Sequence, residues 1–188
     1  EFWGSETDLG SCLDVLENEN SSTEQWWHKR NAQRLAKEDT RGPEFAALTA
    51  FRECDFAPVS MFFKMLNERR SVVNLSHYHL GPRGAMAIAR SVDSSQDIGT
   101  LVLADCGLLD EGVAAMASAM RRNNSVVILD LSGNPFGEPA MREMAEAMLM
   151  NSSLVTLRLR DCKLGCVEME LLSKSLYDNT TVRTLDLR

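Results

Sequence analysis

Histidine and cysteine are the side chains that could do chemistry in this sequence, but the histidines stand in no arrangement typical of a reactive site. They are His28, His77 and His79, and no serine, aspartate or cysteine lies beside any of them in a motif that marks a nucleophile. His77 and His79 supply only two of the ligands that a metal site needs. We therefore expect no catalytic residue and no metal site among them.

The cysteines are odd in number and scattered, which is not typical of a disulfide framework. Cys162 and Cys166 are four residues apart, and no second Cys or His pair stands nearby to complete a zinc tetrad. This usage favours a reducing compartment, so we predict a cytoplasmic location, with cytoskeletal association as one option. The five cysteines are Cys12, Cys54, Cys106, Cys162 and Cys166.

Phosphate-binding and paired-carboxylate motifs do not account for the remaining polar clusters. The run Gly81-Pro82-Arg83-Gly84 lacks the Lys-Ser/Thr ending of a phosphate loop and suits a turn between a strand and a helix. Asp110 and Glu111 stand at an expected helix start, where negative charge complements the helix dipole. We therefore predict a non-enzymatic protein without a cofactor.

Charge and hydropathy restrict the partners. The 188 residues carry 20 Lys plus Arg against 27 Asp plus Glu, a formal net charge of −7. This balance argues against the basic field that nucleic acid or an anionic membrane surface requires. No stretch approaches the roughly 18 apolar residues of a membrane span, and no signal peptide opens the chain. We expect a soluble fragment of a longer protein, because no Met begins it and an apolar run leads directly into Arg188.

A repeat of 28 residues organises the sequence from residue 71 onward. Each unit carries a short run in which apolar and other residues alternate, and such alternation predicts a strand. The second leucines of these runs stand at an unbroken spacing: Leu75, Leu103, Leu131, Leu159 and Leu187.

Apolar residues at helical spacing follow each strand. A small residue recurs in one column of these helices, at Ala89, Ala117, Ala145 and Ser173, which would let neighbouring elements approach closely. The apolar sets are Ala85, Ile88 and Val92; Val113, Met116 and Met120; Met141, Met144 and Met148; and Met169, Leu172 and Leu176.

Polar turns close the units at Asn123, Asn151 and Asn179. These asparagines also begin glycosylation tripeptides, but turn chemistry explains their recurrence and the cysteine usage argues against secretion. We therefore interpret them as turn residues.

A strand and a helix of this length cannot bury their apolar faces alone, so neighbouring units must stack, strand beside strand and helix beside helix. Helices are roughly 10 Å across whereas strands pack about 5 Å apart. The sequence therefore predicts an α/β solenoid that curves, with parallel strands on the concave face and helices on the convex face.

The run Leu-Asp-Leu-Ser-Gly-Asn-Pro-Phe-Gly from Leu129, followed by a Met/Ala helix, resembles the ribonuclease-inhibitor type of leucine-rich repeat. The resemblance covers residues 71–188. In that family an Asn or Cys side chain, three residues after the second strand leucine, satisfies backbone groups of the turn. Here the column holds Tyr78, Cys106, Asn134 and Cys162, so Tyr78 departs from the pattern, and the resemblance implies a packing role for the two thiols.

Upstream, we expect a helical N-terminal cap over residues 1–54 and the repeats over 55–188. The apolar spacing in residues 55–66 predicts the helix of a degenerate repeat with Pro58 in its first turn, whereas the segment 44–52 fits a helix or an irregular strand.

Trp26 and Trp27 have two interpretations. They belong to an expected cap helix, or they anchor a partner, since tryptophan beside arginine is typical of binding hot spots. Alternatively, the acidic and Trp-bearing N-terminal segments drive self-assembly, and the repeats serve as a spacer.

The predicted concave face offers the candidate binding site. Its charges alternate, so two interpretations stay open: solvated residues in mutual ion pairs, or a face that binds a protein surface of mixed charge. The candidate residues are Asn74, Ser76, His77, Val102, Asp105, Asp130, Arg158, Arg160 and Asp161.

The leading hypothesis is an interaction module or scaffold that binds a protein partner through this face and the adjoining loops. The resemblance points the same way, because the family includes inhibitors, innate-immune sensors, actin-filament regulators and axonemal scaffolds. A cytoskeletal regulator is therefore one alternative. Another is a GTPase activator of the Ran type, in which Arg83 would stabilise the transition state.

Overall fold

A parallel sheet of five strands runs along the molecule in chain order. The computed structural model describes residues 43–93 and 95–188. Each strand residue pairs with the residue 28 positions later, as Leu101 does with Leu129. The predicted period of 28 residues therefore equals the offset between paired residues of neighbouring strands. The strands are β1 (Val72–Asn74), β2 (Thr100–Val102), β3 (Ile128–Asp130), β4 (Thr156–Arg158) and β5 (Thr184–Asp186).

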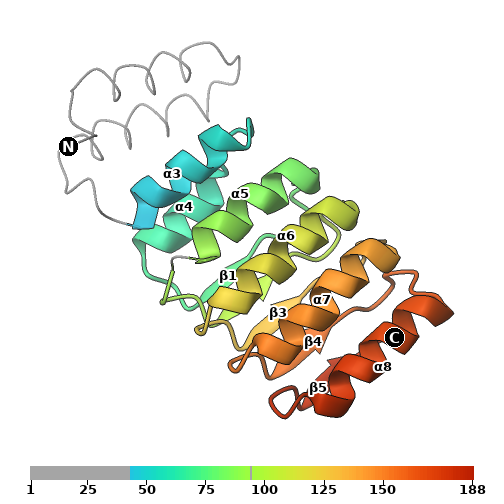
Figure 1. Cartoon of the computed structure of the whole chain (residues 1–188). Helices are drawn as coiled ribbons and strands as arrows, with labels where there is room; N and C mark the ends of the chain where they lie inside the picture. Colours follow the sequence, from blue (N-terminus) through green and yellow to red (C-terminus); the bar gives the residue numbers. More distant parts are fainter. Residues whose placement is uncertain (1–42, 94) are drawn as a thin grey trace, which may run out of the picture.

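Helices cover one face of the sheet and lie side by side along it (Figure 1). One helix follows each of the first four strands, and within the described residues two precede β1. The predicted α/β solenoid, with strands on the concave face and helices on the convex face, is confirmed. The helices are α3 (Pro43–Glu53), α4 (Ser60–Asn67), α5 (Gly81–Asp93), α6 (Leu109–Arg122), α7 (Glu138–Met150) and α8 (Cys166–Asp178).

The predicted leucine column forms the core. Leu75, Leu103, Leu131 and Leu159 are at most 1% exposed, and the apolar residues of α5, α6 and α7 pack against them. Leu187 is 38% exposed, unlike the others of its column. The difference arises because each repeat is covered by the one that follows it. Across the described ranges, no helix is both long and apolar enough to cross a bilayer.

Small residues set the distance between neighbouring helices. A Cβ atom at Gly112 of α6 would lie 2.9 Å from the Cβ of Ala85 in α5, closer than carbon atoms pack. In the predicted small-residue column, Ala89, Ala117 and Ala145 are buried. Close helix contact thus depends on the absence of side-chain volume at this interface.

Buried asparagines join successive repeats where each helix ends. The Asn123 side-chain amide donates to the carbonyls of Val92 and Ser95, at 2.8 and 2.9 Å, and its oxygen accepts from the N–H groups of Ser125 and Val126. Asn151, 28 residues on, makes the equivalent four bonds. Asn123 and Asn151 are 0% and 5% exposed, so the folded chain shields both from glycosylation.

A second set of polar contacts fills the turns after the strands. The Asn134 side chain donates to the carbonyls of Leu103 and Leu131 and accepts from the Cys106 N–H. The Cys106 thiol lies 3.0 Å from the Leu75 carbonyl, so the implied packing role of this thiol fits its position. Tyr78, which departs from the column, is 44% exposed.

Helices α3 and α4 pack at the β1 end of the repeats through aromatic rings. Phe51 contacts Phe56, Phe62 and Phe63, with ring centroids 5.4 to 6.2 Å apart. The open choice for residues 44–52 is settled as helix. The placement of Pro58 in the first turn of α4 was wrong: Val59 is the N-cap and the helix begins at Ser60, because the extended backbone at Val59 ends the preceding segment.

We predict that Asn123→Ala lowers the free energy of unfolding by roughly 2–4 kcal/mol, because two carbonyls and two N–H groups lose their buried partner. Chemical denaturation measures the loss. Asn124→Ala is the matched control, since Asn124 is exposed, and should change stability by less than about 0.5 kcal/mol. Equal effects at the two positions would contradict the bridging role of Asn123.

We also predict selective thiol labelling. Burial raises the pKa of the Cys162 thiol to about 11 and also raises that of Cys106, whereas Cys166 is exposed. At pH 8, iodoacetamide should therefore modify Cys166 at least about a hundredfold faster than either buried thiol, measured by peptide mass spectrometry. Denaturation should remove the difference; rapid labelling of Cys162 in the folded chain would contradict its packing role.

Candidate protein-binding face

The open face of the sheet carries the side chains that alternate with the buried leucines. In β2, β3 and β4 the middle residue is buried and its two neighbours are partly exposed. Successive side chains of a strand point to opposite faces, so residues 28 apart form rows across this one. The predicted site residues lie in three such rows: Asn74, Val102, Asp130 and Arg158; Ser76 and Arg160; and His77, Asp105 and Asp161.

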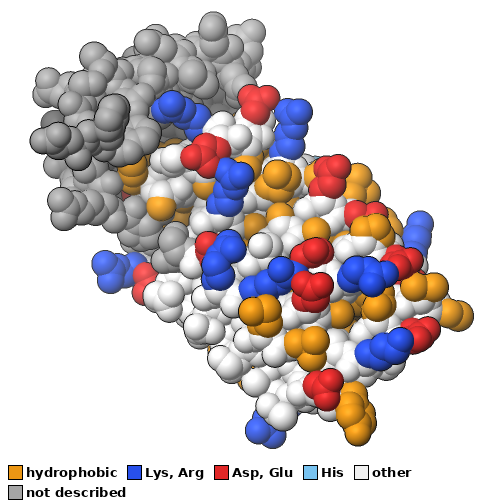
Figure 2. Space-filling view, viewed as in Figure 1, with side chains coloured by type: hydrophobic (Ala, Val, Ile, Leu, Met, Phe, Trp, Pro, Cys, Tyr) orange, Lys and Arg blue, Asp and Glu red, His pale blue; other side chains and the backbone are white. Residues whose placement is uncertain are grey.

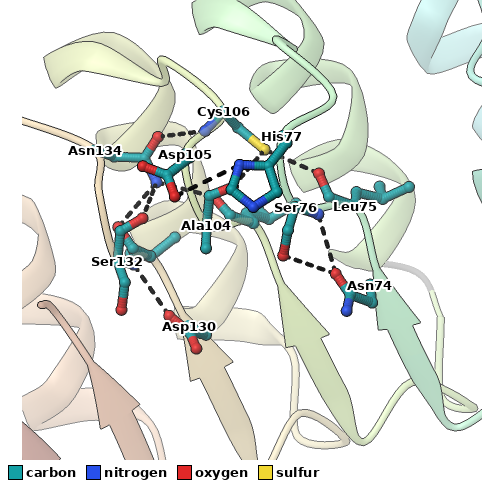
Figure 3. Close-up of polar contacts among 12 residues, drawn as sticks. Asn74, Leu75, Ser76, His77, Ala104, Asp105, Cys106, Asp130, Ser132 and Asn134 are labelled. Atoms are coloured by element: carbon teal, nitrogen blue, oxygen red, sulfur yellow. Dashed lines mark hydrogen bonds and ion pairs between the residues drawn. The ribbon is translucent and has the colours of Figure 1, made fainter.

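Small side chains form a shallow floor just beyond the ends of β1, β2 and β3. This neutral floor is made by Ser76, Ala104 and Ser132, from three neighbouring repeats (Figure 3). At its edge, a Cβ atom at Gly133 would fall 2.0 Å from the Asp105 carboxylate, so glycine is what fits there. That carboxylate covers Gly133, which is therefore not part of the floor.

One residue in each turn after β1, β2, β3 and β4 has a left-handed backbone conformation. His77, Asp105, Gly133 and Asp161 have φ values of 64°, 52°, 69° and 52°, a conformation that favours glycine and short polar side chains. The recurrence turns the chain sharply after each strand. It also brings the His77 ring to 3.6 Å from the Asp105 carboxylate, beside the floor (Figure 3).

Polar side chains at the strand ends also bond to their own turns. The Asn74 side-chain oxygen accepts from the Ser76 N–H at 3.0 Å and from its hydroxyl at 2.8 Å. Asp130 accepts from the Ser132 N–H at 3.0 Å in the equivalent position (Figure 3). These two site residues therefore support the turns as well as facing solvent.

The charges of the face pair within the chain toward its β5 end. Arg158 lies 3.4 Å from the Asp130 carboxylate, and the Arg160 Nε donates to Asp186 at 2.6 Å. Arg188 also bonds to Asp186, and these hydrogen bonds hold the pKa of that carboxyl well below its usual range. The mutual ion pairs expected from the alternating sequence are thus present.

Several other predicted residues lie elsewhere. Arg83 lies in the first turn of α5, not in the preceding loop as expected, because the helix begins at Gly81; it lies 3.1 Å from the Asp55 carboxylate. Trp26 and Trp27 lie outside the described residues. Within those residues, no three His, Cys, Asp or Glu side chains come together in a way that could hold a metal ion.

Sequence reasoning missed the row at the strand starts. These residues share the open face because they precede the first predicted row by two positions, and Val72 is 52% exposed. The same spacing of 28 could have found them. The row is Val72, Thr100, Ile128, Thr156 and Thr184.

The helical face has a different chemistry. Figure 2 shows Lys and Arg interspersed with Asp and Glu over the helices, with apolar side chains between them. The arginines there also form ion pairs, for example Arg122 with Asp93 at 2.9 Å. The helical face lacks the neutral floor, so substitutions on it are suitable controls for substitutions on the open face of the sheet.

Comparisons with known proteins agree with this architecture. A family model described as a leucine-rich repeat matches residues 122–145. The actin-binding site 2 of leiomodin-1 has a similar fold, with a TM-score of 0.61 and 22% identity over 70% of this chain and 81% of that one.

Curated relatives are similar over part of the repeats. The 78-kDa centrosomal protein of Xenopus tropicalis is 35% identical over 71 residues, which are 38% of this chain and 10% of that protein. Its mouse counterpart is 34% identical over 77 residues, 41% of this chain and 10% of that protein. The matched segments thus span about a tenth of these relatives, and the matches do not distinguish a subtype of repeat. The repeat register, the stacked strands and helices, and the family match over residues 122–145 together show a leucine-rich-repeat architecture.

Proposed function

We propose that this chain is a non-enzymatic interaction module that binds a protein partner through the open face of its sheet. The neutral floor is the observation that carries the proposal. Ser76, Ala104 and Ser132 are small, uncharged and partly exposed in three neighbouring repeats, so they leave room for another polypeptide on this part of the face. The polar residues around it supply hydrogen-bonding groups at its margins.

Rigidity supports the same function. The backbone beneath the floor is paired on both sides, since β2 bonds to β1 and β3, and the turns are held by Asn134 and Asp130. A surface that is already ordered loses little conformational entropy when a partner binds. Such a surface suits recognition of a folded or extended protein segment.

The partner that we propose is a component of the cytoskeleton. The similarity to centrosomal proteins of frog and mouse supports this choice among the functions that leucine-rich repeats perform. The likeness to leiomodin concerns the fold and does not by itself suggest actin. The GTPase-activating alternative has no comparable support, because the Arg83 guanidinium is engaged by Asp55.

We expect the tagged chain to concentrate at centrosomes in animal cells, and we expect Ala104→Gln with Ser132→Gln to abolish that localisation. Both substitutions raise neutral side chains from the floor and would hold a partner away from the sheet. Co-localisation with a centrosomal marker measures the effect.

The control variant carries Ala46→Gln with Ser152→Gln, at exposed positions on α3 and in the α7–β4 loop. It adds the same side-chain volume elsewhere and should localise like the wild type. Diffuse wild-type protein would contradict the cytoskeletal proposal, and a floor variant that still localises would contradict the proposed face.

A further inference from the structure

The β5 end of the open face presents arginine to solvent while its acidic partners are covered. The Arg158 and Arg160 side chains are 39% and 43% exposed, whereas the carboxylates of Asp130 and Asp186 are 13% and 14% exposed. The ion pairs therefore do not neutralise the face evenly. A partner that approaches this end of the sheet meets guanidinium groups first.

Most of the donor capacity of these groups is unused. A guanidinium has five N–H donors, and Arg158 directs one of them to Asp130, at 3.4 Å. Arg160 contacts Asp186 through Nε and Nη2, both aimed at the same carboxylate oxygen. Each arginine is thus held in position by an internal acid and can still donate to a second carboxylate.

The spacing of the two arginines selects the shape of the ligand. Arg158 ends β4 and Arg160 follows two residues later, where the ladder continues through the bonds of Leu159 to Asp186 and of Gly133 to Arg160. Residues two apart on a strand lie about 7 Å apart on one face. An extended peptide presents its own alternate side chains at the same interval.

Surrounding charges favour an acidic ligand. Along β4 and the two residues after it, the exposed guanidiniums are those of Arg158 and Arg160, because the carboxylates that pair with them are largely covered. Asp161, which follows Arg160, is also exposed but lies in the turn, beyond the end of β4. Charge complementarity along β4 therefore points to carboxylates rather than to cations.

We propose that Arg158 and Arg160 bind an extended acidic segment of a partner protein, with Glu or Asp at alternate positions. This inference rests on the proposed function, because it names the chemistry of the partner that the open face would bind. The internal acids orient the two guanidiniums before binding, and the segment lies along β4 with its carboxylates directed at them.

The direct test is titration of the full chain with a fluorescent ten-residue peptide that has Glu at alternate positions. We expect saturable binding that weakens at least about threefold between 50 and 300 mM salt, and no binding of the same peptide with Gln in place of Glu. A single-stranded oligonucleotide of equal charge should bind less tightly. Absence of peptide binding, or tighter binding of the oligonucleotide, would overturn the proposal.

Two variants locate the site. Arg158→Gln with Arg160→Gln should weaken peptide binding at least about tenfold, because both charge-assisted contacts are lost. Arg122→Gln removes an arginine that pairs with Asp93 on the helical face in the same way, and it should leave binding unchanged. Equal losses from the two changes would show general electrostatic attraction and contradict the site.

A third variant tests the orienting role of the internal acid. Asp130→Asn removes the charge that holds Arg158 but retains an oxygen that accepts the Ser132 N–H. It should weaken peptide binding by about threefold, because Arg158 is no longer oriented, while thermal unfolding stays nearly unchanged; tighter peptide binding would contradict the orienting role. The two proposals fail separately: loss of peptide binding with centrosomal localisation intact overturns this inference alone, and diffuse localisation with peptide binding intact overturns the cytoskeletal function alone.

Discussion

Each repeat of this protein is completed by its neighbour, and that dependence shapes the rest of the molecule. A three-residue strand and a single helix bury too little apolar surface to be stable alone. The buried amide of Asn123 shows the dependence in one side chain, because it bonds to carbonyls of the preceding repeat and to N–H groups of its own turn. Apolar packing drives the stacking, and these polar contacts fix its register.

The same stacking makes a binding surface available. The leucines face the helices and the strands pair along both edges, so the side chains opposite the leucines have no role in the core. Just beyond β1, β2 and β3 they are small, at Ser76, Ala104 and Ser132, and toward β5 they include arginines held by internal acids. A repeat architecture thus presents a rigid backbone on which the open face can change residue by residue without loss of the fold.

Periodicity predicted most of the fold, because the residues that recur every 28 positions are the ones that packing constrains. The leucine column, the helices and the small residues at Ala89 and Ala117 all follow from it. The start of α4 did not, since it depends on backbone geometry at Val59 rather than on composition. Sequence placed the nine candidate residues on one face, but it could not show that Asp130 is covered while Arg158 is exposed, because side-chain geometry decides that difference. Their role in binding is still a prediction.

The most direct test of the central claim is photo-crosslinking in cells from a photoreactive amino acid placed at one of two positions. At Ala104 the group lies on the neutral floor, and at Arg142 it lies on the helical face. The account predicts a discrete crosslinked protein from position 104 and none from position 142. Crosslinking from position 142 alone, or from neither position, would contradict the claim that this chain binds its partner through the open face of the sheet.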